Sequence, residues 1–389
     1  MSPSSIVIVS ARAEQRFRSG HPWIYRTDIV DVAAAGGDIV TVIGPRDRVL
    51  GQALFSDQSQ ITLRMVTRGD VMMDEALLAA RIDAASGFRE SLALDATAYR
   101  LIHGEADLLP SLVVDRYGEH LVVQALSQGM DRLLPAVVSH LQARLQPAGI
   151  LARNDPKVRS LEGLERTVAV LAGEVPESVL VREGLVEYDV DLRHGQKTGL
   201  FLDQRENREA AARYATGRLL DAFSYNGGFG LSLASRCTDV EALDISADAV
   251  ARITQNAARN GIAHLRAREA NVFDELRRFE RAGERFDTIV LDPPAFAKNK
   301  AAVTNARAGY KDINLRAMRV LKPGGYLVTC SCSYNVTEEM FGEVLEEAAA
   351  DSQAHMTIVE KRAQGRDHPV LVGVPETHYL KCFVLRRLD

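Results

Sequence analysis

The pattern of hydrophobic and polar positions changes character along the chain, and its first part indicates β-structure. Up to about residue 70, short apolar runs at 38–43, 49–55 and 60–66 are separated by glycine, proline and aspartate at turn-like positions. Short runs with turn residues between them predict strands rather than helices. Residues 1–72 are therefore predicted to form an all-β domain, a small barrel.

The next part of the chain mixes two periodicities. Apolar residues at helical spacing predict helices over 73–90 and 130–146. Between them, the apolar runs at 111–115 and 120–124 predict a strand pair joined by a Tyr-Gly turn. Residues 73–183 are therefore predicted to form a central α+β domain.

From about residue 217, apolar strands alternate with amphipathic helices. Strands are expected over 218–223, 239–243, 265–270, 286–291 and 326–330, with helices near 230–236 and over 247–260, 273–282 and 306–321. This alternation is typical of a doubly wound parallel sheet. We therefore predict that residues 184–389 form an α/β, Rossmann-like domain that begins with a lead-in segment.

Composition narrows the class of protein. With 389 residues, 46% of them hydrophobic, the chain can fill several cores. It contains no apolar run of the ~18 residues that a membrane helix needs and no recognisable secretion signal. The four cysteines form no zinc-type array, so no metal site and a reduced, cytoplasmic setting are expected.

The net charge of −5 neither requires nor excludes a nucleic-acid partner, because binding phosphates needs only a local basic patch. Four arginines near the N-terminus could form such a patch: Arg12, Arg16, Arg18 and Arg26. An ordinary charged surface explains them equally well.

Candidate cofactor-binding residues follow the ends of the predicted parallel strands, where ligands bind in sheets of this type. Residues 221–230 (Asp-Ala-Phe-Ser-Tyr-Asn-Gly-Gly-Phe-Gly) carry clustered glycines that would admit a ligand close to the backbone, although a plain turn also explains them. Asp244 can accept bonds from both hydroxyls of a ribose, and Asn271 could bond an adenine edge. Asp274 is expected to be a helix N-cap. This order fits S-adenosylmethionine better than NAD.

The next strand end carries residues 292–298 (Asp-Pro-Pro-Ala-Phe-Ala-Lys). Proline cannot continue a central strand, so the two prolines predict a stiff ledge that could hold a flat base near the cofactor. Phe296 could stack on that base or belong to the core.

The following strand end is Cys330-Ser-Cys-Ser333. Methylation of a pyrimidine at C5 needs a nucleophile, and a thiolate that adds to C6 would supply it. Such a cysteine must be partly ionised, so a nearby cation or helix N-terminus is expected. We interpret Cys237 and Cys382 as structural.

Longer strings identify a family resemblance over nearly the whole chain. They are residues 20–25 (Gly-His-Pro-Trp-Ile-Tyr), 99–107 (Tyr-Arg-Leu-Ile-His-Gly-Glu-Ala-Asp), 112–118 (Leu-Val-Val-Asp-Arg-Tyr-Gly) and 196–205 (Gln-Lys-Thr-Gly-Leu-Phe-Leu-Asp-Gln-Arg). With these strings the chain resembles the bacterial large-subunit rRNA 5-methylcytosine methyltransferases. Members of that family join a PUA domain to a class I methyltransferase domain that uses S-adenosylmethionine.

The resemblance implies roles for individual residues. Residues 221–230 would be the methionine-side loop, and Cys332 rather than Cys330 would be the nucleophile, with Asp292 as the second catalytic residue. The implied cofactor-binding residues are Asp221, Phe223, Tyr225, Asn226, Gly227, Gly228, Asp244, Asn271 and Asp292. The implied substrate-binding residues are Pro293, Pro294, Phe296, Lys298, Gln196, Lys197 and Arg205.

The implied partner is large-subunit rRNA, with no membrane and with a homodimer as a further expectation. Two alternatives stay open. RNA cytosine-C5 enzymes of the usual type carry a second cysteine after the proline of this motif, where the chain has Ala295 and Phe296. Related Asp-Pro-Pro-x-Phe enzymes methylate guanine instead. The other alternative is a non-catalytic RNA-binding protein of ribosome assembly, against which the intact loop, Asp244 and Cys332 argue.

Overall fold

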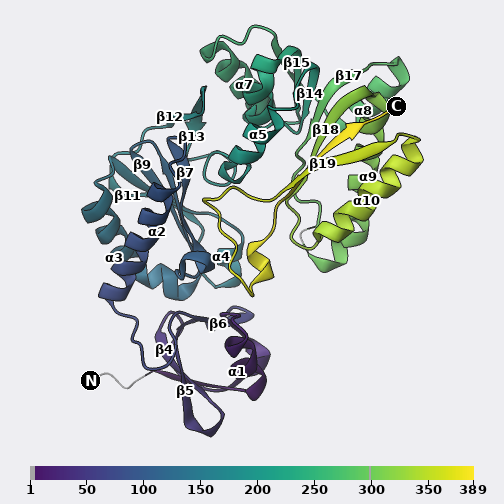
Figure 1. The fold of residues 1–389 in the computed structure, drawn as a ribbon. Coiled ribbons are helices and arrows are strands. Elements are labelled where there is room, and N and C mark those ends of the chain that lie inside the picture. The colour runs from purple at the N-terminus through teal and green to yellow at the C-terminus, as the bar shows by residue number, and fades with distance from the viewer. Residues whose placement is uncertain (1–4, 298) are drawn as a thin grey trace. The chain divides into compact units, whose positions relative to one another are not determined.

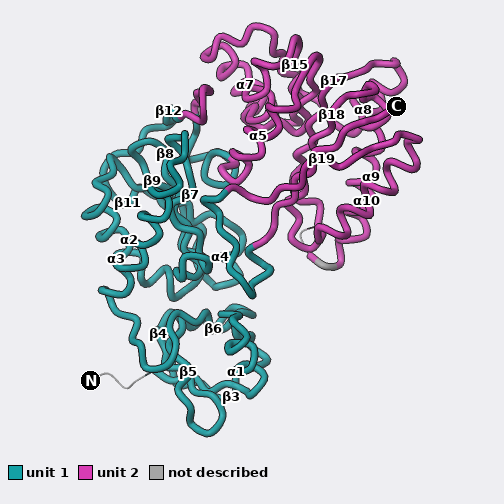
Figure 2. Tube along the Cα trace, in the orientation of Figure 1, with its two compact units in different colours: residues 1–181, 190–200, 366–377 teal, residues 182–189, 201–365, 378–389 magenta. Residues whose placement is uncertain are grey.

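The computed structural model describes residues 5–297 and 299–389, so Lys298 lies outside the described residues. Its contacts divide the chain into two compact units (Figure 2). The first unit comprises Met1–Val181, Val190–Leu200 and Arg366–Thr377, and the second comprises Arg182–Asp189, Phe201–Gly365 and His378–Asp389. The predicted boundary at residue 72 falls inside the first unit, and the division into three domains stays a prediction.

The first unit begins with a six-stranded sheet of order β2-β6-β5-β4-β1-β3, which curls around its own core (Figure 1). Its strands are β1 (Ile6–Val9), β2 (Trp23–Tyr25), β3 (Ile29–Ala33), β4 (Ile39–Gly44), β5 (Arg48–Phe55) and β6 (Ile61–Met65). Alternate residues of β4 are buried, as a strand with one face on a core requires.

The expectation that this segment is all-β is wrong, because helix α1 (Ala11–Arg18) lies between β1 and β2. The helix has its own local signals. The Ser10 hydroxyl caps its N-terminus by accepting the Ala13 N–H at 3.2 Å. Ala13 and Phe17, one turn apart, are buried against the sheet.

A five-stranded sheet of order β11-β10-β9-β8-β7 follows in the same unit. Its elements are α2 (Glu75–Ser91), β7 (Ala98–His103), β8 (Leu112–Tyr117), β9 (His120–Ala125), α3 (Gln128–Leu145), β10 (Gly149–Asn154), α4 (Val158–Leu161) and β11 (Thr167–Gly173). α2, α3 and one face of the sheet share an apolar core. Leu54 of β5 and Val66, the residue after β6, belong to that core, so the N-terminal sheet packs against it.

The second unit contains a seven-stranded sheet of order β16-β15-β14-β17-β18-β20-β19. The strands are β14 (Gly217–Ala222), β15 (Cys237–Asp244), β16 (Leu265–Glu269), β17 (Phe286–Leu291), β18 (Leu321–Ser331), β19 (Met356–Arg362) and β20 (Lys381–Arg387). The helices are α5 (Arg205–Ala211), α6 (Gly228–Leu233), α7 (Ala247–Arg259), α8 (Val272–Ala282), α9 (Val303–Val320) and α10 (Glu338–Ser352). Among the described residues, no helix is long and apolar enough to cross a bilayer.

The first five strands of this sheet are parallel, as predicted, but β20 runs antiparallel between β18 and β19. The strand-helix rhythm that predicted the parallel part ends at about residue 330, and α10, β19 and β20 were not predicted. Two strands, β12 (Ser178–Glu183) and β13 (Val186–Asp191), form a separate hairpin that spans the predicted boundary at residue 183.

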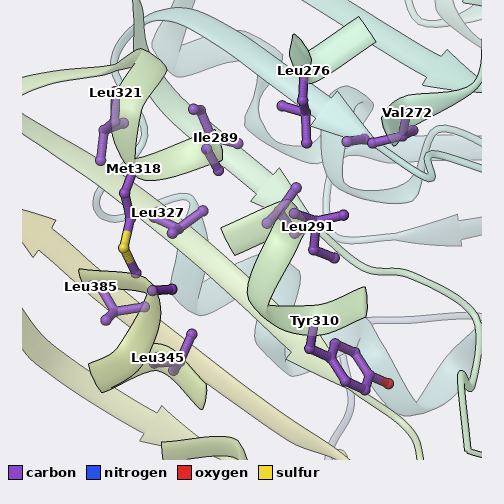
Figure 3. Close-up of a cluster of buried hydrophobic side chains, with 14 of the residues drawn as sticks. Val272, Leu276, Ile289, Leu291, Tyr310, Met318, Leu321, Leu327, Leu345 and Leu385 are labelled. Atoms are coloured by element: carbon purple, nitrogen blue, oxygen red, sulfur yellow. The ribbon is translucent and has the colours of Figure 1, made fainter. Parts of the chain in front are cut away.

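The core of the second unit explains why the central strands β17 and β18 carry apolar runs at 289–291 and 326–328. Ile289 and Leu291 of β17 and Leu327 of β18 are fully buried, and helices α8, α9 and α10 supply Leu276, Tyr310 and Leu345 to the same cluster (Figure 3). A parallel strand with helices on its faces has no solvent side. This core holds the ends of the parallel strands rigidly, and the candidate site lies at those ends.

Candidate active site

Five parallel strands in the order β16-β15-β14-β17-β18 bring their carboxyl ends to one edge of the sheet. The candidate residues lie at or just after those ends: Asp221 near the end of β14 with its loop to Gly228, Asp244 as the last residue of β15, Asn271 after β16, Asp292 to Phe296 after β17 and Cys332 after β18. Sequence periodicity alone was enough to place them at the same edge, the usual ligand position in such sheets.

The loop after β14 has an unusual backbone. Phe223 and Tyr225 adopt positive φ angles of 63° and 50°, which non-glycine residues rarely do, and Gly227 has φ 81°. The Ser224 N–H donates to the Leu243 carbonyl at 2.9 Å, which ties the loop to β15. Such backbone strain persists only where surrounding contacts enforce it, and it is common at ligand sites.

Asp221 holds this loop from beneath. Its buried carboxylate accepts the Gly230 N–H at 2.7 Å and the Ser224 hydroxyl. A Cβ on Gly230 would lie 2.9 Å from the Asp221 carboxylate, so only glycine fits there without displacement. Burial raises the pKa of Asp221 to about 6, although the bonds from Ser224 and Gly230 oppose the shift. The observed contacts of Asp221 shape the loop; its direct contact with a cofactor stays a prediction.

Asp221→Asn is expected to stabilise the second unit at pH 8 and to lose that advantage as the pH falls toward 4. Because the folded pKa is about 6 and the ordinary value is 3.8, the folded state binds more protons between these pH values. The stability contributed by protonation is therefore fully present below pH 3.8 and lost as the pH rises through 6. The amide has no charge to bury, so the gain at pH 8 should be about 1 to 3 kcal/mol. Thermal midpoints of both proteins across this range measure it, and a gap independent of pH would contradict the argument.

The Asp244 carboxylate is oriented so that it could accept hydrogen bonds from the hydroxyls of a ribose. One carboxylate oxygen accepts the Tyr225 N–H at 2.8 Å and the other accepts the Ser246 N–H at 2.9 Å. These bonds fix the orientation of the carboxylate, and each oxygen keeps lone-pair capacity for a further donor. The pair of hydroxyls on the ribose of S-adenosylmethionine is such a donor set, so this part of the site fits the cofactor.

Asn271 is the N-cap of α8, because its side-chain oxygen accepts the Phe273 N–H at 3.0 Å. The expectation that Asp274 caps this helix is therefore wrong. Asp274 lies in the first turn, where its exposed carboxylate pairs with Arg277 at 3.3 Å and with the positive end of the helix. The exposed Asn271 amide keeps its N–H donors for another acceptor, such as a ring nitrogen of adenine.

The loop after β17 is held by contacts that sequence reasoning did not predict. The Gln204 amide donates to the Asp292 carboxylate at 2.9 Å. Pro293 is buried, whereas Pro294 is exposed. The Phe296 ring, half-buried, packs at 4.7 Å between ring centroids from Tyr310 and at 6.0 Å from Phe273. Phe296 therefore belongs to the edge of the core, and its stacking on a base stays a prediction.

The two cysteines after β18 have different surroundings. Cys330 is fully buried and lies opposite Cys382 of β20. Burial, and then the neighbouring Cys382, raise the pKa of Cys330 well above its usual value, which makes it a poor nucleophile. Cys332 is only half-buried, and its sulfur lies 3.9 Å from the Pro293 carbonyl oxygen. Of these two thiols, Cys332 is the one beside the Asp-Pro-Pro ledge.

Ser333 connects the segment after β18 with the loop after β17. Its hydroxyl accepts the Ala297 N–H at 3.1 Å and makes a hydrogen bond with the Tyr310 hydroxyl at 3.0 Å. All three residues are buried. The position of Cys332 relative to the ledge is therefore set by a network inside the core rather than by the surface.

Lys381 is a further residue of this region that the sequence analysis missed. It begins β20, is buried, and donates to the Ser333 carbonyl at 2.8 Å. Burial lowers its pKa to about 8, whereas the charges of Cys332 and Glu338 oppose the shift. A lysine within the apolar run Leu-Lys-Cys-Phe-Val-Leu (380–385) was the available signal.

The remaining predicted substrate residues are divided between the units. Gln196 and Lys197 belong to the first unit, and Arg205 to the second. Arg205 is buried at the start of α5, with its guanidinium 3.7 Å from Glu206. The neighbouring Arg208 forms a buried ion pair with Glu183 and lies against Gly228 of the cofactor loop, a contact not foreseen from the sequence.

Comparison with known proteins agrees with this geometry. Residues 7–68 match the PUA-like domain family, and residues 156–386 match the family of S-adenosylmethionine-dependent methyltransferases. The Ribosomal RNA large subunit methyltransferase I of Tolumonas auensis is 39% identical over 99% of this chain and 100% of its own length. The protein of the same name from Erwinia tasmaniensis is 38% identical over 98% of both chains.

The fold has close relatives among solved structures. The methyltransferase SMU.776, solved in complex with SAH, superimposes with a TM-score of 0.86 at 22% identity, covering 98% of this chain and 99% of that one. A SAM-dependent methyltransferase from Streptococcus mutans gives a TM-score of 0.84 at 21% identity over the same fractions. The predicted α/β fold and the predicted cofactor are thereby confirmed. The chain is an S-adenosylmethionine-dependent methyltransferase and belongs to the family of ribosomal RNA large subunit methyltransferase I.

Proposed function

We propose that this enzyme methylates C5 of a cytosine in large-subunit rRNA, with Cys332 as the nucleophile. The observation that carries the proposal is the position of the Cys332 thiol, at the end of β18 and 3.9 Å from the Pro293 carbonyl. The names of the relatives support large-subunit rRNA as the substrate. A thiol in this position has a chemical use in methylating a pyrimidine such as cytosine, because C5 of a pyrimidine is unreactive until C6 is attacked.

In the proposed reaction, residues of the chain bind the cofactor, orient the base and supply the nucleophile. Asp244 holds the ribose of the cofactor, and Asp221 keeps the loop of Phe223, Tyr225, Asn226, Gly227 and Gly228 in shape. Asn271 would contact the adenine, and Asp292, held by the Gln204 amide, would be the second catalytic residue. Bound S-adenosylmethionine supplies an electrophilic methyl group. Pro293, Pro294 and Phe296 hold the base, with Gln196, Lys197, Lys298 and Arg205 as further RNA contacts.

The thiolate of Cys332 forms a bond to C6, and the electron pair of the C5–C6 double bond becomes available at C5. After C5 has gained the methyl group, a base removes the C5 proton, the double bond reforms and the sulfur–C6 bond breaks. The thiolate is regenerated, so one methyl group is gained and one proton is released per turnover.

An RNA that carries 5-fluorocytosine at the target position tests this function. Fluorine cannot leave as a proton, so the enzyme should remain covalently joined to the RNA through Cys332. A denaturing gel detects the adduct and peptide mass spectrometry locates it. The target nucleotide itself comes from mass mapping of 23S rRNA from cells with and without the protein.

A guanine methyltransferase is the second candidate, favoured by Ala295 and Phe296 in place of a second cysteine. Loss of a methylguanine from the mapped rRNA, with no adduct, would establish it. Loss of no methyl group from any RNA would instead favour the non-catalytic assembly factor. A homodimer and a cytoplasmic location remain predictions.

The N-terminal arginines remain candidates for RNA binding, although each has a partner. Arg12 and Arg16 both pair with Asp28, at 2.6 and 3.3 Å, and Arg18 pairs with Glu14 at 2.8 Å. Arg26 donates to the main-chain carbonyls of Asp57 and Ser59. An exposed arginine in an ion pair can still approach a phosphate, so Arg12 and Arg18 are the residues to test.

The double variant Arg12→Gln and Arg18→Gln should reduce the salt dependence of RNA binding. Loss of two phosphate contacts lowers the slope of log affinity against log salt by roughly 1.5. In this variant Asp28 still forms an ion pair with Arg16, and Glu14 still forms one with Arg48, so the fold should persist. The matched control replaces two exposed arginines of the second unit, Arg266 and Arg278, whose partners also keep a second arginine. Equal slopes for the wild type and the double variant would show that RNA is bound elsewhere.

A further inference from the structure

Lys381 is a buried cation whose direct partners are neutral. Only 3% of its surface is exposed. Within the described residues, its ammonium donates to the main-chain carbonyls of Ser333, at 2.8 Å, and Tyr379, at 3.0 Å. Taking an ammonium group out of water is costly unless a negative charge compensates it. A lysine in this position therefore calls for an anion nearby.

The sheet register brings Lys381 to the residues around Cys332. β20 is antiparallel to β18, with Ser331 opposite Lys381 and Cys330 opposite Cys382. Residues opposite each other in an antiparallel pair project to the same face. The Lys381 ammonium reaches past the end of β18 to the carbonyl of Ser333, the residue after Cys332. The cation is thus tied to the short segment that carries the thiol.

Among the charged and titratable groups near Lys381, Cys332 is the one best placed to supply the compensating negative charge. Glu338, in the first turn of α10, also acts on Lys381 electrostatically, but it forms an ion pair with Lys361 of β19 at 3.1 Å. On α9, burial raises the pKa of the Tyr310 hydroxyl, and the negative charge of Cys332 adds to that shift, so Tyr310 also lies near the thiol. From the loop after β17, Asp292 accepts a hydrogen bond from Gln204.

The pKa of Lys381 agrees with this placement. Burial lowers it to about 8, whereas the negative charges of Cys332 and Glu338 raise it. An electrostatic interaction is reciprocal, so the ammonium favours the thiolate of Cys332 as the thiolate favours the ammonium.

We propose that Lys381 is a positioning residue that holds Cys332 in its thiolate form and fixes the segment that carries it. This inference rests on the proposed function, in which Cys332 is the nucleophile. The lysine acts in its protonated form and touches neither cofactor nor base. It supplies the cation that a reactive cysteine requires.

The test is the pH dependence of Cys332 alkylation by iodoacetamide in the full-length protein without RNA. Iodoacetamide reacts with the thiolate, so the rate follows ionisation, and peptide mass spectrometry reports Cys332 separately from the other cysteines. Lys381→Met removes the charge and keeps the length of the side chain. The alkylation profile should move to higher pH by about one unit, and the rate at pH 7 should fall about tenfold.

Three further variants control the result. Lys322→Met makes the same substitution on β18 at the other end of the strand, where Lys322 pairs with Asp287 at 2.8 Å, and should leave the profile unchanged. Lys381→Arg keeps the charge and should restore most of the wild-type profile. Lys381→Gln keeps donors for the carbonyls but no charge, and should behave like Lys381→Met, which separates charge from hydrogen bonding. Thermal melting and S-adenosylmethionine binding identify which variants are folded.

A wild-type alkylation profile in a folded Lys381→Met or Lys381→Gln protein would overturn the proposal. The experiment uses no RNA, so it is independent of the methylated base. A shifted profile in an enzyme that methylates guanine would retain the coupling of Lys381 to Cys332 while refuting the cytosine chemistry. In an enzyme that methylates cytosine, the acid limb of the methylation rate should shift with the alkylation profile, and the KM for S-adenosylmethionine should not change.

Discussion

Cys332→Ala is expected to reduce methylation of the target RNA by about 10³-fold or more, the scale seen when a covalent nucleophile is removed. The thiol acts on the base and not on the sulfonium, so S-adenosylmethionine affinity should stay within about twofold of the wild type. The substitution removes one atom from a half-buried position, so the fold should persist. Transfer of labelled methyl groups to RNA and calorimetry of cofactor binding measure the two effects separately.

The matched control is Cys330→Ala, two residues earlier on the same segment. Cys330 is fully buried opposite Cys382, and its raised pKa keeps it protonated. Its loss should lower stability modestly, because a small cavity forms in a packed sheet, and should leave most of the activity. If Cys332→Ala instead retained near-normal methylation and 5-fluorocytosine RNA gave no adduct with the wild type, the cytosine assignment would have to be abandoned for guanine.

The parts of the fold that could be predicted are those with a strong local period. β14, β15 and β17 are short, and each carries aliphatic residues that are buried in the sheet. α7 has buried residues at helical spacing, so the sequence alone separates these strands from this helix. α1 was missed because eight residues with four charges give a weak apolar signal. β19 was missed because most of its residues are exposed, as at a sheet edge.

The same distinction applies to the candidate site. Asp221, Asp244 and Cys332 could be placed because each lies at or directly after the carboxyl end of a predicted strand, and parallel strands end at one edge. The residues that hold these side chains in position could not be predicted from the sequence. Gln204 is 88 residues from Asp292, its hydrogen-bond partner, and Lys381 is 48 residues from Ser333. A contact over such separations depends on the packing of whole elements and leaves no periodic trace in the sequence.

Asp244→Ala is expected to weaken S-adenosylmethionine binding by about 1 to 3 kcal/mol, the range for loss of charge-assisted hydrogen bonds to a ligand. This corresponds to a Kd higher by about 5- to 150-fold. Two effects contribute. The carboxylate no longer accepts the ribose hydroxyls, and the Tyr225 N–H loses the acceptor that lies 2.8 Å away. Because Tyr225 has a positive φ of 50°, the loop then also loses a contact that enforces its shape.

Asp244→Asn separates these two effects. The asparagine oxygen can still accept the Tyr225 N–H, so the loop stays in place while the charge and one acceptor are lost. An intermediate Kd is expected. Asp248→Ala, which removes an exposed carboxylate from the first turn of α7 four residues later, is the control for a general change in charge and should leave the Kd unchanged. Calorimetry with purified full-length protein gives all four values. An unaltered affinity in Asp244→Ala would remove Asp244 from the ribose site and would require another acceptor at the ends of β14 to β16.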